Sequence, residues 1–260
     1  MKNIRIVIFI FALTIISTKL FAGGIIKIND TEHRTGVVNT TTVYLSTDFI
    51  RIDILSKGKE SILIYNSTKD ILWSIDKQAN SYMEITGEDV DKMKSMFGDM
   101  EKNTEEVLKK LTEQQRAELE KKLARKNKTE SKIEVKKTAS GQKIDKWICD
   151  KFESDTDSVR TAEIWATNWN NSGLQSDYRG TLSKMLNFLK KFNGRIIKNA
   201  GLNNLEYIGE NSLPIKSISY SKNVARITSE VKEIIVQEIQ ANTFELPQGV
   251  TKKELPIRQL

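Results

Sequence analysis

Residues 41–85 read TTVYLSTDFIRIDILSKGKESILIYNSTKDILWSIDKQANSYMEI. Short runs of β-branched, aliphatic and aromatic residues alternate here with polar clusters that are typical of turns. The runs centre near Tyr44, Ile52, Leu63, Trp73 and Met83. Such an even spacing, about ten residues from run to run, is typical of consecutive antiparallel strands. The stretch therefore predicts a β-meander around which the rest of the chain folds.

The second run shows which side of this sheet is apolar. Ile50, Ile52 and Ile54 alternate with Arg51 and Asp53. Successive side chains of a strand point to opposite faces, so the three isoleucines share one face and the two charged residues share the other. The sequence predicts an apolar face and a polar face.

The third and fourth runs extend this pattern. Residues 62–65 are apolar at every position, which predicts a strand covered on both faces, and we expect a helix to provide the cover. In the fourth run Ile71, Trp73 and Ile75 alternate with a second set, Leu72, Ser74 and Asp76. Ile71, Trp73 and Ile75 therefore share one face of the sheet.

The beginning of the chain has the composition of a targeting segment. Lys2 and Arg5 precede an apolar run at 6–16, and Ala22 stands at a plausible signal-peptidase site. The run is too short for a membrane-spanning helix, which needs about 20 residues. We expect residues 1–22 to be a cleaved signal peptide and 23–260 to be a single periplasmic or secreted domain without a transmembrane span.

Composition narrows the class of protein. The 260 residues carry a net charge of +7, with 38% hydrophobic residues and charges of both signs, which indicates a folded chain. A basic segment at 121–137 lacks interleaved aromatic residues and any nucleic-acid motif. We expect a solvated surface there, with weak contact to anionic lipid headgroups as the alternative, and no nucleic-acid partner.

The period of the apolar residues changes from two to 3.6 after Ile85. Thr86 and Asp89 have the pattern of a helix N-cap, and a two-helix insertion is expected at about 87–127. Its first helix carries a methionine-rich face, formed by Met93, Met96, Phe97 and Met100. Packing on the sheet is the commoner use of such a stripe. Contact with an apolar ligand is the alternative, because methionine side chains adapt to variable partners.

Further strands follow the insertion. We expect them at 133–135, 144–152, 159–167, 213–220 and 224–239, with a first strand at 25–28 and a turn at Ser140 and Gly141. A third amphipathic helix is expected at about 176–193. In all, the pattern predicts about ten or eleven strands and three helices.

The chain offers little for catalysis. It contains no GxSxG, P-loop, GxGxxG, HExxH or paired CxxC motif. His33 is its only histidine and is expected in a solvated loop, and Cys149 is its only cysteine and is expected in a buried strand. A pair of carboxylates brought together by the fold is the remaining route to a hydrolase. We expect a protein that is not an enzyme and needs neither cofactor nor metal.

The order of these motifs resembles a known family. TTVYLSTDFIRIDI, SILIYNSTKDILWSID, SYMEIT, LTEQQRAELEKKL, GQKIDKWICDKFE, TAEIWATNW, LPIKSISY and FELPQGV together resemble an uncharacterised family of secreted bacterial proteins, grouped with the LolA/LolB-like lipoprotein carriers. This resemblance covers nearly all of the chain after the signal peptide. It implies a half-barrel, which is a single curved antiparallel sheet with helices over its concave face.

Carriers of that superfamily bind acyl chains between sheet and helices. The resemblance implies that an apolar lining is formed by Ile50, Ile52, Ile54, Ile62, Ile64, Trp73, Ile75, Met93, Met96, Phe97 and Met100. The expected function is binding of a lipid or another apolar ligand, with an envelope protein as a further candidate partner. The alternative is an interaction or sensor module of the same fold whose hollow is filled by its own side chains.

Overall fold

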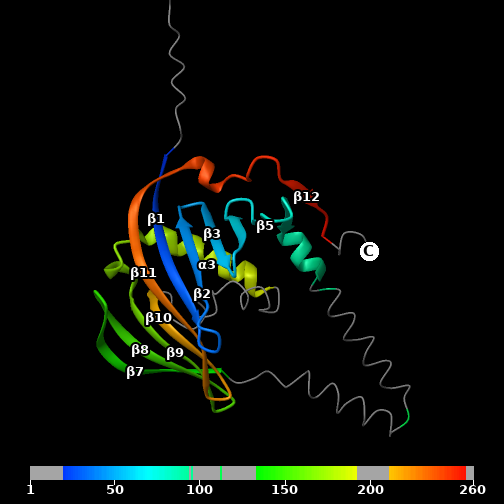
Figure 1. Cartoon of the computed structure of the whole chain (residues 1–260). Coiled ribbons are helices and arrows are strands. Elements are labelled where there is room, and N and C mark those ends of the chain that lie inside the picture. The colour runs from blue at the N-terminus through cyan, green and yellow to red at the C-terminus, as the bar shows by residue number, and fades with distance from the viewer. Residues whose placement is uncertain (1–19, 94, 96–111, 113–132, 192–210, 256–260) are drawn as a thin grey trace, which may run out of the picture.

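The structure is a computed structural model, and it describes residues 20–93, 95, 112, 133–191 and 211–255. The described strands form one open sheet of twelve strands in the order β12-β6-β5-β4-β3-β2-β1-β11-β10-β9-β8-β7 (Figure 1). All neighbours are antiparallel except β12 and β6, which are parallel. The prediction of a mainly β chain with a single antiparallel sheet is confirmed in this form.

The strands and helices have the following bounds. The strands are β1 (Leu20–Glu32), β2 (Val38–Leu45), β3 (Phe49–Ser56), β4 (Lys59–Asn66), β5 (Ile71–Asp76), β6 (Ser81–Thr86), β7 (Ile133–Ile144), β8 (Trp147–Thr156), β9 (Val159–Asn168), β10 (Ser212–Ser221), β11 (Val224–Gln240) and β12 (Thr251–Lys253). The helical segments are η1 (Trp169–Asn171), α3 (Ser176–Lys190) and η2 (Ala241–Phe244), besides the start of the insertion described below. The third predicted helix is therefore present as α3.

The meander from β2 to β6 follows the predicted spacing. Each strand pairs with the next in sequence, for example Ile52 with Leu63 and Tyr65 with Leu72. The turn between β3 and β4 places Lys57 and Gly58 at positive φ, 52° and 75°. Two consecutive residues in that conformation match the twist of a two-residue hairpin.

One expected turn is wrong. Ser140 and Gly141 lie inside β7, and the chain reverses at residues 145–146 instead. The pairing of β7 with β8 is irregular between Lys137 and Gln142, and Gly141 has a φ of +69°. The polar residues that suggest a turn in the sequence thus mark a bulge within one long strand.

One side of the sheet, which we call the inner face, packs against α3. Ile50 and Ile52 lie on this face fully buried, and Tyr65, the cross-strand partner of Ile50, packs at a tilt on Phe188 of α3, with 5.5 Å between the ring centroids. Figure 1 shows α3 crossing the strands on one side of the curved sheet. The main hydrophobic core therefore lies between α3 and the sheet.

The opposite side, the outer face, has its own cover. Ile62, Ile64 and Ile75 are buried there, with Leu246 and Val250 packed against them. The C-terminal segment supplies this cover after η2 and then adds β12 to the edge of β6. Both faces of β4 are covered, as its all-apolar pattern predicts, but the outer cover is an extended segment and not the helix we expected.

The insertion begins as a helix over residues 87–93. Its N-terminus is capped reciprocally: Asp89 Oδ2 accepts from the Thr86 amide at 2.9 Å, and the Asp89 amide donates to Thr86 Oγ1 at 3.2 Å. This confirms the predicted cap. Val90 is buried in the inner core, and Met93 packs against it. The remainder of the predicted two-helix insertion lies outside the described residues, apart from Ser95 and Thr112.

Candidate ligand pocket on the inner face

An apolar pocket opens on the inner face beside α3. Strands β1, β2, β3, β10 and β11 and helix α3 contribute to its wall. Side chains that line it include Ile26, Ile28, Val43, Ile52, Ile215 and Val231, with Leu182 from α3. These residues come from chain segments about 200 positions apart, which the pairing of β1 with β11 brings together.

The pocket is a trough rather than a closed chamber. Its cavity volume is about 60 Å³, and the hollow together with its opening to solvent measures about 640 Å³. Ligand sites usually measure about 300–1,000 Å³, so the cavity volume of about 60 Å³ lies well below that range, and the protein encloses only a small part of any ligand at this place. An apolar molecule could lie along this trough in contact with aliphatic side chains.

A row of polar residues crosses the sheet at one end of the pocket. Asn39 on β2 stands opposite Asp30 on β1, which stands opposite Ser229 on β11, which stands opposite Ser217 on β10. Directly opposed residues of antiparallel strands share a face, so this row lies on one face across four strands. Ser229 and Ser217 line the pocket directly. We call these four residues the polar row.

The polar row contains acceptors that the protein leaves unused. Oδ1 of Asp30 and Oδ1 of Asn39 are buried and have no hydrogen-bond partner among the described atoms. Burial raises the pKa of Asp30, and a hydrogen bond from the Ser229 side chain opposes part of that rise. A partly buried carboxyl group thus lies next to the pocket, although Asp30 and Asn39 are not part of its wall.

The structure divides the predicted lining residues into two sets. Ile52 lines the pocket, and Ile50 and Ile54 lie on the same inner face within or against the main core. Ile62, Ile64, Trp73 and Ile75 instead lie on the outer face. Assigning those four to the inner lining was wrong, because β4 and β5 present these residues to the C-terminal segment and present Leu63, Tyr65 and Leu72 to the core.

The methionine-rich face is only partly described. Met93 packs against the inner core but is not part of the pocket wall. Met96, Phe97 and Met100 lie outside the described residues.

Sequence reasoning missed the half of the pocket built from the two ends of the chain. Ile26, Ile28, Ile215 and Val231 were not among the expected lining residues. Alternation in Ile26, Lys27 and Ile28 gives a local signal that was available. The pairing of β1 with β11, which places that strand beside the meander, has no local signal.

The two candidate nucleophile and base residues do not form a catalytic site. His33 is exposed in the turn after β1, where its Nε2 lies 2.8 Å from Thr228 Oγ1. Cys149 is buried on β8, and burial together with the charge of Asp150 raises the pKa of its thiol to about 11. Within the described part of the chain, no three His, Cys, Asp or Glu residues are grouped as a metal site would require.

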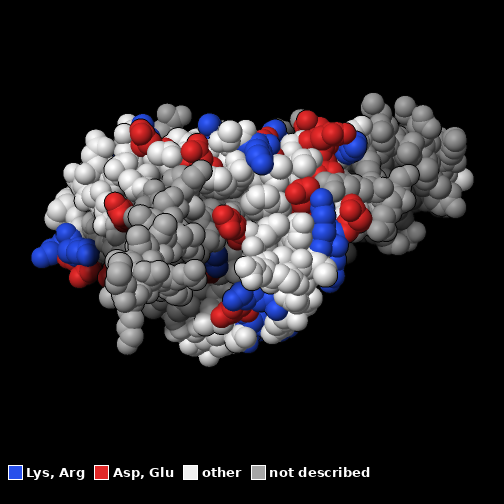
Figure 2. All heavy atoms as spheres, turned by 90° about the horizontal axis from the view of Figure 1, so that it is seen from above, with Lys and Arg blue, Asp and Glu red and all other residues white. Residues whose placement is uncertain are grey.

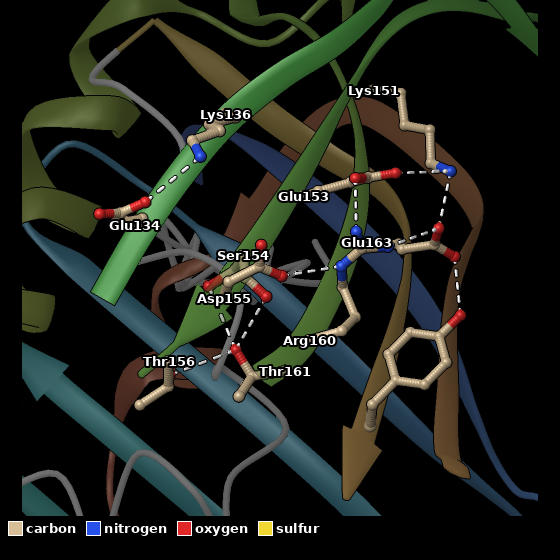
Figure 3. Close-up of polar contacts among 11 residues, drawn as sticks. Glu134, Lys136, Lys151, Glu153, Ser154, Asp155, Thr156, Arg160, Thr161 and Glu163 are labelled. Carbon is tan, nitrogen blue, oxygen red and sulfur yellow. Dashed lines mark hydrogen bonds and ion pairs between the residues drawn. The ribbon is translucent and has the colours of Figure 1, made fainter. Parts of the chain in front are cut away.

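Among the described residues, a dense cluster of charges lies on β8, β9 and β10 (Figure 3). Glu163 Oε1 is 2.7 Å from Lys151 Nζ, and Glu163 Oε2 accepts from the Tyr220 hydroxyl at 2.7 Å. Arg160 joins Glu153 at 2.6 Å and Asp155 at 2.9 Å. We call this set the cross-strand ion network.

In this network two cations, Lys151 and Arg160, are shared among three carboxylates. Burial alone would raise the pKa of Glu163, but hydrogen bonds from Lys151 and Tyr220 outweigh burial and lower it. Burial and the hydrogen bond to Glu163 raise the pKa of Tyr220 to about 12. A carboxylate held ionised by two donors is poorly suited to act as a general acid. The arrangement therefore suits a clamp between strands better than a reactive site.

On the face of the molecule seen in Figure 2, the described residues form no large patch of a single charge. Figure 2 shows Lys and Arg side chains interspersed with Asp and Glu over the face seen from above. Of the helices that the structure describes, none combines the length and apolar composition needed to cross a membrane.

Comparison with known proteins assigns no family to this chain. No protein-family model matches the chain, and no curated protein matches it. A solved structure of an uncharacterized conserved protein from Thermus thermophilus is similar with a TM-score of 0.47 and 7% sequence identity, covering 90% of this chain and 91% of that one.

Proposed function

We propose that this chain is a non-enzymatic periplasmic protein that binds a lipid or another apolar ligand on the inner face of its sheet. The observation that carries the proposal is the apolar trough beside α3, which Ile26, Ile52, Val231 and Leu182 line. Burial of an alkyl chain against such a wall is favourable by about 25 cal/mol for each Å² of apolar surface removed from water.

Two features of the sequence support the location and the fold family. The basic and apolar start of residues 1–22 has the pattern of a signal peptide. The order of strand motifs resembles the LolA/LolB-like carriers, in which a curved sheet and helices enclose acyl chains. A half-barrel of that kind is our proposal for the finer description of this open sheet.

A second candidate is an interaction or sensor module that binds no ligand. The observation that favours it is the small enclosed volume, about 60 Å³, together with the filled core under α3, where Tyr65, Phe188 and Tyr178 are buried. Under this alternative the trough is a packing defect of the core. Ligand binding separates the two candidates directly.

The test uses the environment-sensitive apolar dye N-phenyl-1-naphthylamine with the chain from Gly23 onward. We expect its fluorescence to rise on binding, and we expect Val231→Phe to abolish the rise by filling the trough. The matched control is Val236→Phe, because Val236 lies on the same strand with 51% of its surface exposed and does not line the pocket.

A cooperative thermal unfolding transition in each variant is the check that both are folded. Loss of dye binding in Val231→Phe alone supports the proposal. Equal dye binding in the two variants, or none in the unmodified chain, would favour the module without a ligand.

A further inference from the structure

The polar row suggests what kind of ligand the trough accepts. Resting on the proposed function, we infer that the ligand is an amphiphile whose head group donates hydrogen bonds, an alcohol or a protonated amine, placed against Asp30 and Asn39. Its alkyl chain lies along the aliphatic wall, and its donor meets the two buried acceptors that have no partner among the described atoms.

The polar row lies at one end of the trough. Ile26, Ile28 and Asp30 follow one another on the same face of β1, at every second residue. Ile26 and Ile28 line the trough, and Asp30 stands opposite Ser229, which also lines it. Asp30 is therefore the next residue on this face beyond Ile28, and a head group that projects past the end of the wall lies beside it.

The two unused acceptors lower the stability of the ligand-free protein. A buried oxygen without a donor costs free energy that an apolar side chain at the same place would not cost. Asp30 and Asn39 are paired across β1 and β2, so both Oδ1 atoms lack a donor at one place on the face. A ligand with an O–H or N–H group relieves this deficit.

An anionic head group fits the polar row poorly. A carboxylate or phosphate carries only acceptors when ionised, so it cannot donate to either unused oxygen, and it would also face the Asp30 carboxyl group. A second hollow, which Asn39 also lines, is an alternative site for an anionic head group. Its wall carries three basic residues, Arg34, Lys57 and Arg226, together with Glu32. An anionic head that bypassed Asp30 would be drawn to that hollow instead, so the experiment includes one.

The experiment measures displacement of bound N-phenyl-1-naphthylamine by four amphiphiles with matched chains. Decan-1-ol and decylamine carry donors, methyl decyl ether lacks one, and decanoate is anionic. We expect the two donor-bearing compounds to displace the dye at concentrations about tenfold or more below the ether, and decanoate to be weaker still.

Variants of the polar row test whether these residues cause the preference for head groups that donate hydrogen bonds. Asp30→Asn should keep decan-1-ol binding and weaken decylamine, because it keeps a carbonyl acceptor and removes the charge. Asp30→Leu combined with Asn39→Val should erase the preference for donors while raising the melting temperature of the ligand-free protein, since it removes two unsatisfied acceptors. Glu233→Gln, whose carboxylate pairs with Lys27 on the outer face, is the matched control and should change neither.

The outcomes distinguish this inference from the function on which it rests. Dye binding with equal displacement by ether and alcohol, or a preference that survives the double variant, would overturn the donor inference and leave apolar ligand binding standing. Stronger displacement by decanoate would overturn it as well and would assign the head group to the basic hollow. Failure of the dye and of every amphiphile to bind would overturn both.

Discussion

The thiol of Cys149 should be inert in the folded protein. Its side chain is 1% exposed, and its pKa of about 11 keeps it protonated at pH 8. We expect labelling by a thiol reagent such as DTNB to proceed at the rate of unfolding in buffer and to be complete within seconds in guanidinium chloride. Rapid stoichiometric labelling of the folded chain would contradict this placement.

Truncation of Ile52 should lower the free energy of unfolding more than truncation of an exposed isoleucine. It is fully buried between β3 and the core and also lines the trough. We expect Ile52→Ala to lower the free energy of unfolding by about 2–5 kcal/mol. The measurement is chemical unfolding, with Ile148→Ala as the control. Ile148 is 58% exposed, and its truncation should cost less than about 0.5 kcal/mol.

At the scale of single residues, the sequence predicts which side chains share a face within one strand but not how strands are phased against one another. Alternation correctly separated Ile52 from Arg51 and Asp53. It could not show that Ile62, on the next strand, faces the other side, because residues 62–65 are apolar at every position. Only the register, which pairs Ile52 with Leu63, decides that phase.

At the scale of elements, the cross-strand ion network should make acid stability depend on Glu163. The pKa of this carboxyl is lowered in the folded state, so its contribution is present above the unfolded pKa, about 4.3, and is lost as the pH falls through the lower folded value. We expect Glu163→Gln to lower the free energy of unfolding at pH 7 by about 1–2 kcal/mol, and with it the melting temperature. The decline in stability between about pH 5 and pH 3 should be shallower in this variant than in the unmodified protein.

Glu233→Gln serves as the control for this second series as well. Its pair with Lys27 is about half exposed, and such pairs contribute little. If Glu163→Gln and Glu233→Gln had the same pH profile, the network would have no special part in joining β8, β9 and β10.

The C-terminal segment should behave as part of the core. Phe244 is buried and stacks on Phe49 at 5.5 Å between centroids, and the Thr243 carbonyl accepts from Arg51 at 2.8 Å. We expect Phe244→Ala to cost about 3–5 kcal/mol of unfolding free energy. Glu245→Ala, at the exposed next position, should leave the urea midpoint almost unchanged. A small loss for both would show that the outer cover is dispensable.

Element boundaries were predictable where local chemistry determines them. The Thr86 and Asp89 cap and the hairpins of the meander depend on residues close in sequence. The bulge at Ser140 and Gly141 has the same composition as a turn, so pattern alone could not distinguish them. The short strand β12 depends on a parallel partner, β6, far earlier in the chain.

At the scale of the whole molecule, the pocket arises from the pairing of the two ends of the chain. β1 lies between the meander and β11, so residues near both termini line the trough beside Ile52 from the meander. The sequence predicts the apolar face of each part separately. Non-local pairing has no signature in a local window, so the alternation of Ile26 and Ile28 was available in the sequence, but their place beside Ile52 could not be predicted.

The most direct measurement of the central claim is native mass spectrometry of the protein purified from its own cell envelope, followed by extraction and identification of whatever it carries. We expect a one-to-one adduct that organic solvent removes, with an alkyl chain and a hydroxyl or amine head, and we expect it to be absent from the Val231→Phe variant. A bare mass in the unmodified protein, with no melting shift when decan-1-ol is added, would contradict ligand binding in the trough.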